Sequence, residues 1–163
     1  MSGDWPDDDV APAIATAGRA MMAAMLRRLA DKGFEEITPA IIAFITQIDP
    51  EGDRAAALAH RAGVTKQAMS QLLRTVVSRG YVEQVADPGD TRAKIIRCTK
   101  RGVSLRDACF TVRDELHQLV VDELGERNAD RLRDDLERVQ AAFRSAAPSA
   151  PASTKRATSR EQK

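Results

Sequence analysis

The stretch RGYVEQVADPGDTRAKIIRCTKRG, residues 79–102, contains two short runs of strand-forming residues on either side of a turn. YVEQVA (81–86) and AKIIRCT (93–99) are rich in β-branched and aromatic side chains, and the Asp-Pro-Gly-Asp tetrapeptide (87–90) between them is typical of a turn. The pattern predicts a two-stranded hairpin. Because a hairpin of two strands is marginally stable alone, we expect it to pack on the neighbouring helices.

The residues before this hairpin have the spacing of a helix-turn-helix. RAAALAHRA (54–62) and TKQAMSQLLRTVVSR (65–79) are helical patterns separated only by the dipeptide Gly63-Val64, and Thr65 is a suitable N-cap for the second helix. The side chains expected to face inward and hold the two helices together are Leu58, Ala62, Val64, Met69 and Leu72.

The second helix of this pair has a polar outer face. Lys, Gln, Ser and Arg side chains are those that reach phosphates and base edges in the major groove of DNA. The predicted recognition-helix residues are Thr65, Lys66, Gln67, Ser70, Gln71 and Arg74. A helix-turn-helix followed by a basic hairpin is a winged helix, in which the second helix enters the major groove and the hairpin, or wing, reaches the adjacent minor groove or backbone.

Positive charge is concentrated in the same part of the chain. Residues 54–106 hold 11 Lys/Arg and 3 Asp/Glu, a balance of +8, although the whole chain carries only +1. Such a region is the electrostatic footprint of a polyanion-binding protein. A solvated basic surface with no partner is the alternative that charge alone leaves open.

The helical patterns at the two ends have narrow apolar stripes. They cover about residues 13–32 and 102–145, and the later segment carries two seams of a/d type. The stripe residues are Ile14, Ala17, Met21, Met25 and Leu29, then Leu105, Cys109, Val112, Leu116 and Leu119, and finally Ala129, Leu132, Leu136, Val139 and Phe143. We predict a dimer interface from these helices, with packing inside the subunit as the alternative.

The expected fold is mainly α with a small two-stranded β-wing: a winged helix-turn-helix at about residues 37–101, flanked by dimerisation helices in a domain spanning 13–145. The acidic residues 1–12 and the basic Ala/Pro/Ser-rich residues 146–163 are predicted to be disordered. The absence of a long apolar run, of a secretory signal and of a disulfide framework favours a cytoplasmic protein.

The order of residues 79–102 resembles the wing signature of the MarR family of bacterial transcriptional regulators, and the likeness extends over about residues 10–145. The matching positions are Gly80, Val82, Glu83, Asp87, Pro88, Asp90, Arg92, Ala93, Thr99 and Gly102. The resemblance implies a homodimeric repressor that binds a pseudo-palindromic operator and is released by a small phenolic or lipophilic effector. It also implies that Arg92 enters the minor groove and that Asp90 holds the wing shape, while Lys94 is expected to reach phosphate at most.

Two further hypotheses concern sites away from the DNA. An effector pocket at Met21, Met25 and Phe44 competes with the interpretation that these are core residues. Cys98 stands where the family pattern has Leu, so it and Cys109 are either small hydrophobic side chains or redox-sensing thiols.

Other classes of function have less support in the sequence. A winged-helix protein–protein adaptor without DNA binding remains an alternative. The balance of +8 and the polar face of the second helix argue against it, because an adaptor surface should show an exposed apolar or aromatic patch. No catalytic or phosphate-binding motif and no metal-ligand spacing is present, so neither an enzyme nor a cofactor or metal is predicted.

Overall fold

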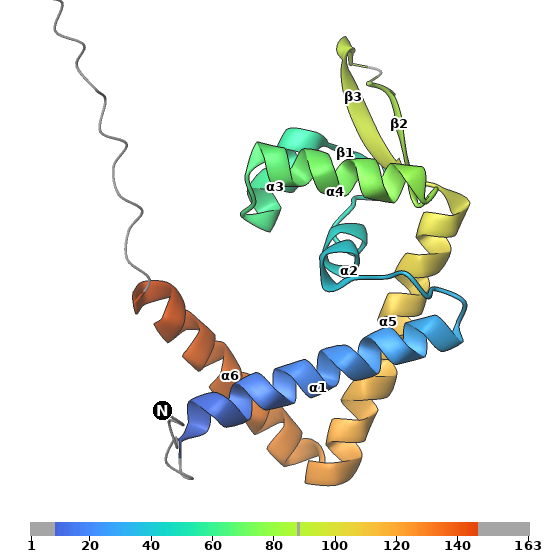
Figure 1. The fold of residues 1–163 in the computed structure, drawn as a ribbon. Helices are drawn as coiled ribbons and strands as arrows, with labels where there is room; N and C mark the ends of the chain where they lie inside the picture. The colour runs from blue at the N-terminus through green and yellow to red at the C-terminus, as the bar shows by residue number, and fades with distance from the viewer. Residues whose placement is uncertain (1–8, 88, 147–163) are drawn as a thin grey trace, which may run out of the picture. The chain divides into compact units, whose positions relative to one another are not determined.

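The computed structural model describes residues 9–87 and 89–146, apart from the side chains of Thr91 and Arg92. The elements, labelled in Figure 1, are α1 (Val10–Asp31), α2 (Pro39–Ile45), β1 (Asp53–Arg54), α3 (Ala55–Ala62), α4 (Lys66–Ser78), β2 (Val82–Asp87), β3 (Asp90–Cys98), α5 (Lys100–Leu124) and α6 (Glu126–Ala146). The predicted class, mainly helical with a small antiparallel sheet, is confirmed. Within the described ranges, no helix has the length and hydrophobicity that a membrane crossing demands.

The chain divides into two compact units, one up to Leu119 and one from Val120 onward, so the boundary falls within α5. The first unit holds the sheet and every helix before α5. In the second unit α6 is an amphipathic helix whose charged face carries ion pairs one turn apart, such as Arg133 with Asp130 at 2.9 Å. Pairs of this kind give a solvated helix modest support.

The first helix begins earlier than predicted. The backbone amide of Ala11 donates to the Asp9 carboxylate at 2.9 Å, so Asp9 caps α1 and the helix starts at Val10. The prediction of disorder through residue 12 is therefore wrong for residues 9–12, because a carboxylate at the N-cap satisfies a helix amide that would otherwise lack a partner. Residues 1–8 and 147–163, which complete the predicted disordered ends, lie outside the described residues.

The helix-turn-helix forms where the sequence placed it. Gly63 ends α3 with a φ of 62°, and the amide of Ala68 donates to Oγ1 of Thr65 at 3.2 Å, which makes Thr65 the N-cap of α4. Of the predicted inward residues, Leu58 and Met69 are buried and Leu72 is half-buried, whereas Ala62 and Val64 are exposed. Their assignment was wrong because the turn is closed by the backbone amide of Val64, which donates to the carbonyl of Ala59 at 3.2 Å, and not by side-chain packing.

The sheet has a third strand that the sequence analysis missed. β2 and β3 pair antiparallel as predicted, and the two residues of β1 pair with the other edge of β3 in the order β1-β3-β2. The register of the hairpin shifts between Ala86, which faces Lys94, and Asp87, which faces Asp90. Such an irregularity bends a strand and increases its local twist.

The core of the first unit is formed by α1, α2, the helix-turn-helix, the sheet and the first part of α5. Four residues of the first predicted α5 seam lie in it, namely Leu105, Cys109, Val112 and Leu116. Those residues pack inside the subunit, so the interpretation of this seam as a dimer interface was wrong for them. An apolar stripe has the same period whether it packs within a chain or against a second copy, and only Leu119 of this seam is exposed.

The end of the wing is joined to α5 by the Thr99-to-Gly102 segment. Oγ1 of Thr99 donates to the carbonyl of Gly80 at 2.6 Å and accepts from the amide of Gly102 at 3.1 Å. The guanidinium of Arg101 lies over the ring of Tyr81, 4.8 Å from its centroid. These contacts explain why Thr and Gly close the wing motif: Thr99 caps the first turn of α5 and ties it to the start of β2.

Candidate nucleic-acid interface

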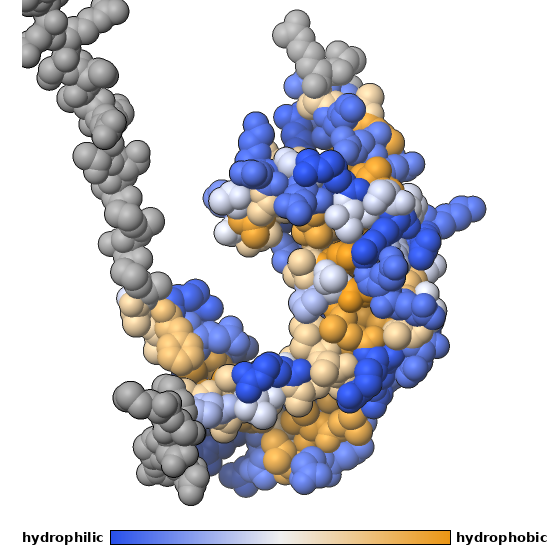
Figure 2. All heavy atoms as spheres, viewed as in Figure 1, coloured by the Kyte–Doolittle hydropathy of each residue, from blue (hydrophilic) through white to orange (hydrophobic). Residues whose placement is uncertain are grey.

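One face of α4 is polar and exposed. Met69 and Val76 are buried on its inner side, and the predicted recognition residues are all exposed: Thr65, Lys66, Gln67, Ser70, Gln71 and Arg74. Hydrophilic side chains dominate the surface around α4 and the hairpin in Figure 2. Four of the six, Lys66, Gln67, Gln71 and Arg74, are long side chains that can extend several ångströms from the helix.

The two hydroxyl residues of this face are partly engaged by the helix itself. Thr65 accepts from the amide of Ala68, and Oγ of Ser70 donates to the carbonyl of Lys66 at 2.8 Å. A hydroxyl that donates its proton still offers lone pairs, so Ser70 can accept a hydrogen bond from a base edge. The face therefore combines two long amides, Gln67 and Gln71, with a hydroxyl acceptor, Ser70, between them.

The predicted wing residues all belong to β3. Asp90 and Lys94 are exposed and lie on either side of the register shift in the hairpin. Arg92 lies between them in the strand, but its side chain lies outside the described residues. The structure thus brings the three positions together on one strand at the turn end of the hairpin, away from the junction with α5.

An ion pair between Arg54 and Asp87 lies at the base of this turn, and the sequence analysis missed it. Nε of Arg54 donates to Oδ2 of Asp87 at 2.8 Å, while the amide of Gly89 donates to Oδ1 at 2.8 Å. These donors hold the pKa of Asp87 below its usual value, with the Gly89 amide as the larger cause and the Arg54 guanidinium as the next. The resemblance assigned the bracing role to Asp90, whereas Asp87 is the carboxylate seen paired with Arg54.

Asp90 is nevertheless close enough to matter electrostatically. Its charge contributes, after that of Asp87, to raising the pKa of Arg54. The bracing role of Asp90 stays a prediction. The sequence pattern does identify Asp87 as a turn residue, because Asp is common directly before a turn. It does not identify the partner of Asp87, since Arg54 lies 33 residues earlier and no local signal links residues so far apart.

The proposed effector-pocket residues have three different environments. Phe44 is buried in the core, Met25 is half-buried against it, and Met21 is exposed. Two cavities of the described part of the chain have linings that include none of these three residues. One, of about 320 Å³, lies between α2 and α4 and includes Thr38, Gln71 and Arg79.

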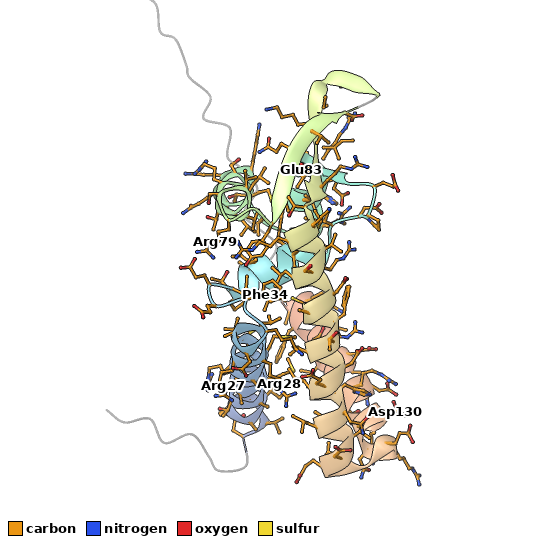
Figure 3. All side chains as sticks on the ribbon, turned by 90° about the vertical axis from the view of Figure 1, so that its right-hand side faces the viewer. Arg27, Arg28, Phe34, Arg79, Glu83 and Asp130 are labelled. Atoms are coloured by element: carbon orange, nitrogen blue, oxygen red, sulfur yellow. The ribbon has the colours of Figure 1, made fainter. Side chains whose placement is uncertain are left out.

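The second cavity, of about 420 Å³, is lined by α1 and by Leu119 of α5. Close to it, Glu115 of α5 pairs with two cations, Nη1 of Arg28 in α1 at 2.7 Å and Nζ of Lys32, the residue after α1, at 3.2 Å. Figure 3 shows Arg28 in the space between these two helices. The ion pairs fix α1 against α5 within the first unit.

The two cysteines are in environments that suppress thiolate formation. Cys109 is 1% exposed, and burial raises its pKa to about 11. Cys98 is half-buried, and burial also raises its pKa, although the charge of Arg106 partly offsets the shift. Because the thiolate is the reactive form, neither environment favours a redox sensor. Among the described residues, no group of His, Cys, Asp and Glu is arranged to hold a metal ion.

Part of the chain is similar to a known protein family. The model of the MarR family matches residues 32–93, from the residue after α1 through both helices of the helix-turn-helix and into β3. Residues 32–93 are therefore similar to the MarR family. One protein of known structure in this family, from Rhodococcus sp. RHA1, is a transcriptional regulator. A comparison with curated protein sequences finds no match.

Several solved structures share the fold over most of the chain. FabT from Streptococcus pneumoniae, determined in complex with DNA, has a TM-score of 0.74 at 15% identity and covers 85% of this chain and 97% of its own. MepR from S. aureus, also determined with DNA, has a TM-score of 0.67 at 20% identity, with coverages of 83% and 99%. CouR from Rhodococcus jostii RHA1, bound to p-coumaroyl-CoA, has a TM-score of 0.63 at 22% identity, with coverages of 81% and 92%.

Proposed function

We propose that this chain is a sequence-specific DNA-binding regulator of the MarR type, and that it acts as a homodimeric repressor released by a small molecule. The observation that supports DNA binding most directly is the exposed face of α4. It carries Lys66, Gln67, Gln71 and Arg74 at the end of a helix-turn-helix, next to a hairpin with Arg92 and Lys94. This is the arrangement in which a helix reads the major groove while a wing reaches the backbone or minor groove.

Exposed apolar side chains on the flanking helices support the homodimer. A monomer in water rarely leaves so many large apolar groups exposed on a few helices. They are Val10 and Met21 of α1, Val103, Phe110, Leu119, Val120 and Leu124 of α5, and Leu132 and Phe143 of α6. A second copy of the chain is the partner that would cover such surfaces, and a two-fold dimer would present two α4 helices to a pseudo-palindromic operator.

The repressor role is what the resemblance to the MarR family implies. The effector is supported by one protein that shares the fold. CouR, which shares the fold, was determined with the thioester of a phenolic acid, and this supports an effector that combines an aromatic or lipophilic body with negative charge. Met21 and Met25 remain candidates to contact it, whereas Phe44 is committed to the core. The experiment that tests effector release is a search for lipophilic anions that lower DNA affinity without dissociating the dimer.

Two alternatives receive less support from the structure. A protein–protein adaptor would display an apolar patch on its winged helix, yet the outer face of α4 is polar. A thiol-oxidation sensor would need an accessible thiol with a lowered pKa, and the pKa of both Cys98 and Cys109 is raised.

The recognition role of α4 predicts a change in sequence preference. Replacing Gln67 and Ser70 with alanine is expected to remove about 1–3 kcal/mol of discrimination at the base pairs that these side chains contact, with smaller losses on unrelated duplexes. Competition between sequence variants of a selected operator measures this.

Ser78→Ala is the matched control, because Ser78 is on the same helix and its hydroxyl makes the same kind of bond to a backbone carbonyl, that of Thr75, at 2.9 Å. Ser78 lies at the opposite end of α4, so its replacement should leave sequence preference unchanged. A uniform loss of affinity on all duplexes in the Gln67 and Ser70 variants would show that these residues only contact the backbone.

A further inference from the structure

The two residues of β1 connect the helix-turn-helix to the wing. Their backbones pair with Ile96 and Ile95 of β3, and each side chain forms an ion pair with a different element. Asp53 accepts from Nη1 of Arg61, near the end of α3, at 2.9 Å. Arg54 donates to Asp87, at the end of β2. The strand that joins the sheet edge is therefore also a link from α3 to the turn of the hairpin.

The carboxylate of Asp87 is buried and accepts hydrogen bonds from Arg54 and from the amide of Gly89. Asp87 is 8% exposed and is the one charged residue classed as buried among the described residues. A buried carboxylate is costly unless it is paired and hydrogen-bonded, and here Arg54 and the amide of Gly89 provide the partners. Without Arg54, Asp87 would have to turn toward water or lose charge, and the turn that it closes would loosen.

Close packing fixes where this link meets the sheet. A Cβ added at Gly52, directly before β1, would lie 2.3 Å from Cγ2 of Ile95 and 3.0 Å from the carbonyl oxygen of Ile96. The backbone before Asp53 and Arg54 therefore lies against β3 without an intervening side chain. The backbone of Arg54 is therefore fixed against β3, and its ion pair with Asp87 restricts the conformations that the turn of the hairpin can adopt.

We propose that Arg54 is a positioning residue for DNA binding: through Asp87 it sets where the wing stands relative to α4, so that both reach one duplex together. The proposal rests on the proposed function and deepens it. Arg54 need not touch DNA in this mechanism. It acts by reducing the freedom of the hairpin before binding, and a preorganised binding element loses less entropy when the complex forms.

A direct phosphate contact is the rival role for Arg54, since its side chain is 55% exposed. The two roles give opposite results for Asp87→Asn. If Arg54 positions the wing through Asp87, this variant loses affinity. If Arg54 binds phosphate, the variant frees a cation and affinity rises or stays the same. Glu83→Gln is the matched control, because Glu83 is an exposed carboxylate of the same strand, labelled in Figure 3, and the change in net charge is equal.

The experiment measures duplex affinity for the full-length chain and its variants. We expect Arg54→Gln and Asp87→Asn each to weaken binding about tenfold relative to Glu83→Gln. In an Arg92→Ala background each should cause little further loss of affinity, because the position of the wing matters only if the wing carries its arginine. Arg54→Lys keeps the charge but not the two-nitrogen contact with one carboxylate, and it is expected to be impaired as well. The reversed pair Arg54→Asp with Asp87→Arg should recover part of the loss. Asp87→Asn binding as tightly as Glu83→Gln would overturn the proposal.

Hydrogen exchange tests the same link without DNA. The amides of residues 85–87 and 89–94 are expected to exchange faster in Arg54→Gln than in Arg113→Gln, which removes an exposed arginine of α5 that pairs with its neighbour Asp114. Unchanged exchange in the hairpin would contradict the positioning role. A wild-type chain that binds no duplex would instead contradict the proposed function, so the two failures are distinguishable.

Discussion

Replacing Arg92 with alanine is expected to weaken operator binding by about 1–3 kcal/mol, or roughly tenfold to a hundredfold, while the dimer stays intact. Arg92 lies in the part of β3 next to the register shift, where the hairpin departs from regular pairing. An arginine inserted in a narrow minor groove is attracted by its concentrated negative potential. Fluorescence anisotropy of a labelled operator gives the affinity, and sedimentation of the free protein gives the oligomeric state.

Arg97→Ala is the control for this prediction. Arg97 is an exposed arginine of the same strand. Its backbone lies opposite that of Glu83 in the hairpin, close to the junction with α5 and far from the turn. Both variants remove one positive charge, so they should lose equal long-range attraction for DNA. If Arg97→Ala reduced affinity as much as Arg92→Ala, charge alone would explain the effect and the wing would have no specific role.

Gly102→Ala is expected to destabilise the fold by about 3 kcal/mol. A Cβ at this position would lie 1.9 Å from the carbonyl oxygen of Tyr81 and 3.0 Å from its carbonyl carbon, so the clash is with backbone that cannot rotate away. Relief would require α5 to move off the start of β2 and would strain the hydrogen bonds of Thr99. Urea unfolding at a fixed protein concentration measures the change, since a dimer's stability depends on concentration.

Gly18→Ala is expected to stabilise the fold slightly, in contrast to Gly102→Ala. Gly18 lies within α1, and a Cβ there would meet nothing within 4 Å, so only the helix propensity changes. Alanine is favoured over glycine in a helix by about 1 kcal/mol, and we expect a small gain in stability. Equal effects of the two substitutions would show that the contact between Gly102 and Tyr81 is not what requires glycine.

Local signals in the sequence predicted the helix-turn-helix and the hairpin well. Thr38 and Thr65 cap α2 and α4 as expected, and Gly63 and Gly80 adopt left-handed conformations at the ends of α3 and α4. Each signal involves residues within one turn of each other, so it needs no knowledge of the tertiary structure. The polar face of α4 followed from the same helical period.

Features that depend on distant pairing were missed or misread. A strand of two residues, such as β1, has no measurable period, and the Arg54–Asp87 pair joins residues that only the sheet brings together. The α5 seam was assigned to a dimer because its period does not reveal its partner, and most of it packs in the core of its own subunit. The redox hypothesis lost support for a similar reason, since burial, which controls thiol reactivity, is a property of the fold.

Selection of bound duplexes from a random pool tests directly whether this chain binds DNA as a sequence-specific dimer. The full-length wild-type chain is incubated with the pool, and the retained duplexes are sequenced after several rounds. We expect enrichment of an inverted repeat whose half-sites lie about one helical turn, roughly 34 Å, apart, because a two-fold dimer presents two α4 helices to one face of the duplex. A pool that stays random, or that yields a single half-site without its repeat, would contradict a dimeric sequence-specific regulator.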